Sequence, residues 1–433
     1  MTSFVTGAKA MHSDRYGNLV TAASAEACAA YQHGVDLFLG AEAGVPDALN
    51  AAIALDPNMA CAHLALARHY QSYMKRDLVA HHLAAARAAK GLSAQEQGQV
   101  HALGLLLEGR GPEAFAAIKA HLADHPRDAL VAQPCIGVFG MIGFSGQPGR
   151  EAEQLAFTTS LAPQFGDDWW FLAGHAFAQM EAGRTGPAEI SIEKSLAQRP
   201  RSGNGAHYRS HLYYEVGEIT AGYHYLRDWQ ADYGRSGLLH CHNGWHIALM
   251  ALAEGDEAAM WEAIDRDVAP GPESGPPLNI LSDMASILYR AEVAGVTVPA
   301  ARWQAVSDYA ARFFPNPGLA FGDVHAALAH AMAGRGDALA KIISDAKGPA
   351  ADVVSSLAAG FGALAAGQWA EALATFTPIM PVHERIGGSR AQRDLIEFAY
   401  VTALLKLNQG DEARRTLAAR RPVVREGFVA GLA

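Results

Sequence analysis

EAGRTGPAEISIEKSLAQRPRSGNGAHYRSHLYYEVGE, residues 181–218, contains one complete repeat unit of this chain. The unit runs from a turn at Gly183 to a turn at Gly217, 34 positions further on. Glycine suits such turns because it tolerates the left-handed conformation at a helix end. Between them Arg199-Pro200 marks the end of a helix, since proline stops one helix and starts the next unit. The stretch therefore predicts a helix–turn–helix unit of tetratricopeptide size.

The same kind of turn recurs along the chain at intervals of 33 to 43 residues. The series is Gly109, Gly149, Gly183, Gly217, Gly255, Gly295, Gly334, Gly367 and Gly410. Extended backward through Lys75-Arg76-Asp77 and Gly44, it predicts roughly eleven helical hairpins. Hairpins of this kind bury their apolar faces only by stacking. We predict an all-α fold of tetratricopeptide-like hairpins stacked in a superhelix, either open or closed into a bowl.

Composition supports a folded array and excludes several partners. Half of the 433 residues are hydrophobic, which is too many for a disordered chain, and the net charge of −10 argues against nucleic acid. Residues 1–433 are expected to form a single array, with a weak boundary at 270–278, where Gly271-Pro272 begins a proline-rich loop. The opening residues do not resemble a signal peptide, and the uncharged run Ala129–Gly149 is interrupted by proline and glycine. We therefore expect a cytoplasmic protein without membrane partners. We also expect a homodimer, on the sole ground that homodimers are the commonest oligomers of soluble proteins.

Histidines recur at similar heights on the first helix of several hairpins. His101, His175, His211, His246 and His325 lie six to nine residues before their turn glycines, a spread of about one helical turn. Two of these helices carry a second histidine four residues earlier, at His207 and His242, and residues four apart share a helix face. The pattern predicts a layer of imidazoles facing one cavity.

Imidazoles beside a carboxylate suggest a metal site or acid–base chemistry. The candidate catalytic residues are His207, His211, His242, His246, Asp323 and His325, and the candidate metal ligands are His242, His246 and His211, with a divalent transition metal such as zinc. The other interpretation is that each histidine packs in the helix stack. HNGWH at 242–246 lacks the glutamate of the HExxH motif, so no zinc-protease motif is present.

A second candidate site is GGSRAQRD, residues 387–394. Two glycines, a helix N-cap at Ser389 and the following helix would form an anion cradle, with Arg390 and Arg393 as donors to a carboxylate or phosphate. The alternative is an ordinary capped helix start with solvated arginines. The candidate substrate-binding residues of the chain are Arg393, Ser389, Trp245, Asn243, His175 and Tyr289.

These motifs together resemble the tetratricopeptide repeat protein 38 family, nearly from end to end. The resemblance rests on Gly17-Asn18-Leu19 with Glu26-Ala27-Cys28 as an opening helix, Asp124-His125-Pro126-Arg127-Asp128 as a turn, His207-x-x-x-His211, Cys241-His242-Asn243-x-Trp245-His246, Asp283 with Leu288-Tyr289-Arg290, Asp323-Val324-His325 and Gly387-Gly388-Ser389-x-Ala391-Gln392-Arg393-Asp394. Generic tetratricopeptide proteins lack the CHNxWH and GGSxAQRD strings. The chain departs from the family at Tyr213 and Tyr214, where family members carry His-Glu, and the family name implies no activity.

Two functions remain open from the sequence. The first is a histidine-rich pocket on the inner wall for a small, anionic ligand, with metal-assisted hydrolysis or lyase chemistry as its enzymatic form. The second is a non-catalytic interaction scaffold that binds a peptide in the concave groove. Whether the chain is an enzyme is undecided at this point.

Overall fold

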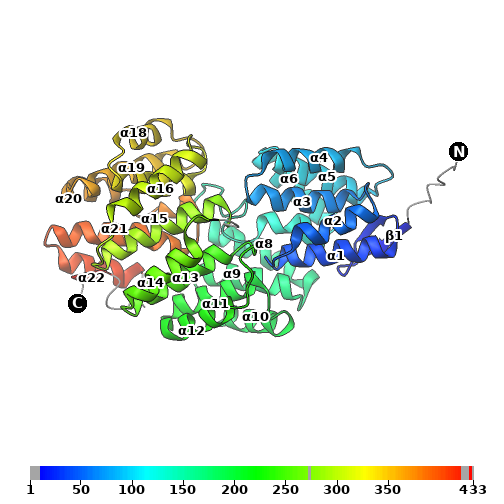
Figure 1. The fold of residues 1–433 in the computed structure, drawn as a ribbon, viewed down its shortest axis with the longest axis horizontal. Coiled ribbons are helices and arrows are strands. Elements are labelled where there is room, and N and C mark those ends of the chain that lie inside the picture. Colours follow the sequence, from blue (N-terminus) through cyan, green and yellow to red (C-terminus); the bar gives the residue numbers. More distant parts are fainter. Residues whose placement is uncertain (1–9, 272–274, 421–428, 432–433) are drawn as a thin grey trace.

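The computed structural model describes residues 10–271, 275–420 and 429–431 (Figure 1). It opens with an antiparallel hairpin of β1 (Ala10–Ser13) and β2 (Leu19–Ala22), in which Ala10 pairs with Ala22 and Ser13 with Leu19. The expectation of an opening helix is therefore wrong for Gly17-Asn18-Leu19. Gly17 has a φ of 83° and forms the hairpin turn, whereas Glu26–Cys28 do lie in the first helix.

The remaining described residues form 22 α-helices and three short helices of other types, in which ten A/B pairs pack as hairpins and the fourth pair, α7 and α8, is irregular, where the glycine series predicted roughly eleven hairpins. We call the first helix of each pair the A helix and the second the B helix. The A helices are α1 Ala25–Leu39, α3 Ala60–Ser72, α5 Ala94–Leu107, α7 Ala129–Ala132, α9 Trp169–Glu181, α11 Gly203–Val216, α13 His240–Ala253, α15 Pro277–Val293, α17 Ala320–Met332, α19 Ala351–Ala365 and α21 Arg390–Lys406. The B helices are α2 Val45–Leu55, α4 Arg76–Ala88, α6 Gly111–Asp124, α8 Arg150–Phe165, α10 Thr185–Gln198, α12 Ile219–Gln230, α14 Glu257–Ala263, α16 Ala300–Phe313, α18 Gly336–Asp345, α20 Trp369–Phe376 and α22 Gly410–Arg420.

Two hairpins differ from the expected form. In the fourth, α7 is only one turn long and continues as a short 3-10 helix, Gln133–Cys135, because Pro134 and the glycines that follow interrupt the α-helix. In the eleventh, Gly410 is the first residue of α22, and Asn408, with a φ of 60°, supplies the left-handed turn in its place. None of the described helices is long and apolar enough to span a membrane.

A helices lie inside the array and B helices cover them. In α13 every residue from His240 to Leu252 is buried, whereas in α18 only Ile342 is. The inner positions of the A helices are therefore where polar side chains would need partners, because a buried polar group without a hydrogen bond costs free energy.

Both ends of the array return to its centre. The segment after α1 contacts the start of α11, where the Gly203 N–H donates to the Gly40 carbonyl at 2.7 Å. At the other end of the array, α21 packs against α15 and also against α11, which lies about 180 residues before it in the sequence. Figure 1 shows the hairpins α1–α6 and α15–α22 on opposite sides of the central helices α9–α13. α11 is therefore contacted by segments from both halves of the superhelix.

Candidate metal centre

Four histidines from two consecutive A helices meet in the interior. His207 and His211 come from α11, His242 and His246 from α13, and one ring nitrogen of each lies within 4.8 Å of the other three. All four side chains are buried, and His211 and His246 are 0% exposed. The i, i+4 spacing on each helix places each pair on one face, and the packing of successive hairpins places the two faces opposite each other.

The closest contacts join the Nε2 atoms of three of these rings. His211 Nε2 lies 2.9 Å from His207 Nε2 and 3.1 Å from His246 Nε2. A single imidazole nitrogen carries either one proton or one lone pair, so His211 Nε2 cannot make two good hydrogen bonds of opposite sense. When two nitrogens each bind one zinc ion at about 2.0–2.1 Å, an N–Zn–N angle of 90° or slightly more gives an N···N distance of about 3 Å. The two separations are also hydrogen-bond distances, and the four nitrogens together form a group that could hold a cation.

The fourth histidine is held by a carboxyl group. His242 Nδ1 lies 2.9 Å from both Oδ1 and Oδ2 of Asp283, which is on α15. Asp283 is 1% exposed, and burial raises its pKa. An ionised Asp283 can only accept, and with that partner Nδ1 of His242 carries the ring proton and Nε2 keeps the lone pair.

Burial favours the neutral form of two of the four imidazoles. It is the largest cause that lowers the pKa of His207 and of His246, and the neighbouring histidines lower both values further. Neutral imidazoles keep the lone pair that a metal ion needs, and a positive ion would replace the missing solvent as the partner of these lone pairs. At His207 and His246 the electrostatics thus favour a lone pair over a second ring proton.

Aromatic rings surround the four histidines. The Phe177 ring centroid lies 5.0 Å from that of His211, and Trp245 stacks on His242 at 5.2 Å with an interplanar angle of 7°. Phe139 lies beyond His242, with 6.5 Å between the ring centroids. These rings separate the site from solvent.

The other predicted members of the histidine layer lie outside this cluster. His175 Nδ1 contacts the Thr158 hydroxyl of α8 at 2.9 Å, and His101 lines an open surface hollow of about 510 Å³. His325 Nδ1 lies 2.7 Å from the Phe321 carbonyl oxygen, and its ring packs on the Phe321 ring, which contacts Phe139. Height along a helix is therefore not enough to bring a side chain to the site.

The carboxyl group at the histidines is Asp283 and not Asp323. Asp323 accepts the N–H of Gly318 at 2.9 Å, at the start of its own helix, and burial raises its pKa to about 6. Among the predicted substrate-binding residues, Trp245 lies against the histidines, and Asn243 is fully buried on the same helix. Tyr289 packs on Phe361, with 6.3 Å between ring centroids.

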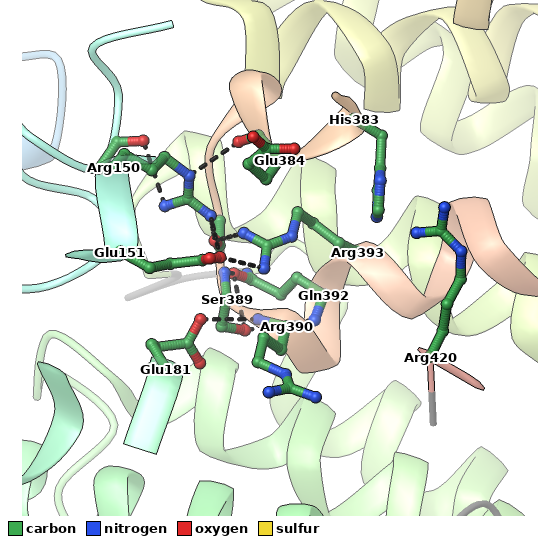
Figure 2. Close-up of polar contacts among 12 residues, drawn as sticks. Arg150, Glu151, Glu181, His383, Glu384, Ser389, Arg390, Gln392, Arg393 and Arg420 are labelled. Carbon is green, nitrogen blue, oxygen red and sulfur yellow. Dashed lines mark hydrogen bonds and ion pairs between the residues drawn. The ribbon is translucent and has the colours of Figure 1, made fainter. Parts of the chain in front are cut away.

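Figure 2 shows that the chain's own side chains occupy the predicted anion cradle. Ser389 is the N-cap of α21 and forms a capping box with Gln392, as the sequence indicated. Arg393 pairs with Glu151 of α8, and the backbone N–H of Arg390 donates to Glu181 of α9 at 2.9 Å. Internal carboxyl groups therefore hold the positions where an anionic ligand was expected. No local motif points to these partners, which lie more than 200 residues away in the sequence.

The buried carboxyl group of Glu181 provides a prediction on pH. Burial first, and then repulsion from Glu215 and Glu151, raises its pKa from 4.5 to about 8. The folded state therefore binds this proton more tightly than the unfolded state, so the stabilisation is full below about pH 4.5 and is lost as pH rises towards about 8. We expect Glu181→Gln to remove this loss, so that the variant gains about 1–3 kcal/mol on the wild type between pH 6 and 8.5, measured by urea unfolding.

Glu371→Gln, at an exposed position of α20, is the matched control and should leave the pH profile of the wild type unchanged. Parallel profiles for wild type and Glu181→Gln would show that Glu181 is ionised in the folded protein over this pH range.

Comparisons with known proteins give only distant likenesses. No family model matches the sequence. Yeast Tom70 is similar over 92% of this chain and 84% of its own, at 12% identity and a TM-score of 0.38. The TPR domain of P58(IPK) is similar over 90% of this chain and 100% of its own, at 15% identity and a TM-score of 0.20. The tetratricopeptide-like architecture described above rests on the helical hairpins of this chain itself.

Proposed function

We propose that this protein binds a divalent transition metal ion, of which zinc is the first candidate, inside its helical array. His207, His211, His242 and His246 are the ligands, which adds His207 to the three ligands expected from the sequence. The observation that carries the proposal is the convergence of four buried imidazoles, with one ring nitrogen of each within 4.8 Å of the others. Nitrogen ligands suit zinc, copper, nickel and cobalt better than magnesium or calcium.

We also propose that the chain is a relative of the tetratricopeptide repeat protein 38 family. The positions of the quoted motifs support this. The CHNxWH string supplies two of the four histidines, and Asp128 of the Asp-His-Pro-x-Asp string is buried and contacts His121 Nε2 at 2.9 Å. Tyr213 packs beside Tyr225 rather than at the histidines, so that departure from the family falls outside the metal centre.

An interaction scaffold is the second candidate, because helical arrays of this class commonly present extended binding surfaces. That argument is analogy at the level of the fold. A peptide or small-molecule partner, the cytoplasmic location, the homodimer and the single-domain organisation stay predictions. The boundary expected at 270–278 lies partly on residues 272–274, outside the described residues.

Metal analysis tests the proposal. The full chain, purified without a histidine tag and dialysed, should retain about one equivalent of a transition metal by elemental analysis. His211→Gln/His246→Gln should retain less than about a tenth of that. The control is His63→Gln/His82→Gln, which alters another buried pair whose Nδ1 atoms lie 3.0 Å apart. A metal-free wild type that also fails to take up added Zn²⁺, Co²⁺, Ni²⁺ or Cu²⁺ would disprove the function.

A further inference from the structure

The contact between His242 and Asp283 determines what kind of metal centre this is. We propose that Asp283 is the positioning residue of a closed, four-histidine centre, in which the ion is structural and keeps no open coordination position. The proposal rests on the metal binding argued above and goes beyond it, because a catalytic ion needs a position for water or substrate, whereas a structural ion is bound by four protein ligands.

Asp283 fixes which nitrogen His242 presents. Its two oxygens both lie 2.9 Å from His242 Nδ1, and the Ser282 hydroxyl lies 3.4 Å from Oδ1. A carboxylate accepts hydrogen bonds and does not donate them, so the proton of His242 is on Nδ1 and the lone pair is on Nε2. Carboxylate groups that accept from the far nitrogen of a metal-bound histidine set its tautomer and ring orientation in this way.

The fourth position is therefore filled by an imidazole. The His242 ring centroid lies 4.7 Å from that of His207 and 5.0 Å from that of His246. Asp283 is already engaged with Nδ1, which leaves it the supporting role rather than that of a ligand. Four imidazoles then complete the usual tetrahedral set of a structural zinc ion.

The surroundings favour the closed form. Trp245 lies on His242 and, with 4.7 Å between ring centroids, against His246, while Phe177 covers His207 and His211. An exchangeable water ligand would need a polar route through these rings. The ion would instead join α11 to α13 and, through Asp283, to α15, so three consecutive A helices are fixed at one point.

Cobalt provides the first test, because its visible spectrum reports the ligands. The full-length wild type is loaded with Co²⁺ and titrated with azide and with cyanide. A closed centre should give a tetrahedral spectrum that neither anion changes while the ion stays bound. A shift of the bands on anion binding would reveal an open position and overturn the proposal. Failure of the wild type to bind Co²⁺ at all would instead disprove the metal site itself.

Variants of Asp283 and His242 provide the second test. Their affinity for Zn²⁺ is measured by competition with a chromophoric chelator. Asp283→Ala should weaken binding about 10- to 100-fold, and Asp283→Asn less, because its amide oxygen still accepts from Nδ1. Asp323→Asn, at a buried carboxyl group outside the centre, is the control and should bind as the wild type does. Unchanged affinity in Asp283→Ala, or in His242→Ala, would show that the centre does not depend on this pair.

Discussion

Removal of the proposed metal ion is expected to lower the melting temperature of the wild-type protein by about 4–8 °C. An ion present at about a thousand times its dissociation constant stabilises the state that binds it by about 4 kcal/mol, and a chain of this size shifts by about 1–2 °C per kcal/mol. The loss is large because the four histidine side chains are buried and an ion would hold two helices together at this point. His211 and His246 are 0% exposed, so water cannot replace the ion without opening the helix stack.

The measurement is a thermal scan with and without a strong chelator, followed by addition of Zn²⁺. We expect the chelated protein to regain its stability with the metal. His211→Gln/His246→Gln should melt at one temperature in both conditions, whereas His63→Gln/His82→Gln should respond to the chelator as the wild type does. If the wild type and the double variant at 211 and 246 gave the same small response, the ion would not contribute to folding.

The repeat architecture and the four clustered histidines could be predicted from the sequence, whereas the contact of Asp283 with His242 could not. Glycine turns are local signals, since a left-handed residue is needed wherever one helix reverses into the next. The pairs His207/His211 and His242/His246 are local signals too, because four residues make nearly one turn. Their meeting follows from the stacking of consecutive hairpins, so the sequence contained enough to place them together.

The predicted layer of histidines was wrong for His175 because it used only the number of residues between each histidine and its turn glycine. His175 lies eight residues before its turn glycine, between the six of His211 and the nine of His246. Yet its ring faces Thr158 on a B helix, because 3.6 residues per turn also set the direction in which a side chain points. Asp283 carried no local signal that joined it to His242, 41 residues earlier. Its role depends on how two helices pack, which the spacing of residues along one helix does not contain.

The predicted anion cradle failed for a related reason. Its local features are all present, including the capping box at Ser389. The carboxyl groups that fill it, Glu151 and Glu181, come from α8 and α9, which lie more than 200 residues before α21 in the sequence. Which distant helices meet depends on the twist accumulated over several repeats, and no short motif specifies that twist.

The contact that joins α11 to α21 should be among the most sensitive points of the fold. The Tyr214 hydroxyl of α11 donates to Asp394 Oδ2 of α21 at 2.6 Å, and Arg290 of α15 donates to the same hydroxyl at 2.9 Å. Asp394 and Arg290 are 2% and 1% exposed. We expect Asp394→Ala to lower the free energy of unfolding by about 3–5 kcal/mol, because it removes negative charge near the buried Arg290 guanidinium and leaves a cavity.

Tyr214→Phe should cost less, about 1–2 kcal/mol, since it removes hydrogen bonds and leaves both charges in place. Asp411→Ala, which breaks the exposed ion pair with Arg414, is the control and should change stability by less than about 0.5 kcal/mol. Urea unfolding gives these values, and hydrogen exchange should show the extra opening of Asp394→Ala first in α21 and α22. Equal stability of Asp394→Ala and Asp411→Ala would mean that α21 is held by its apolar face alone, because removal of the buried carboxyl group would then have no more effect than removal of a solvated one.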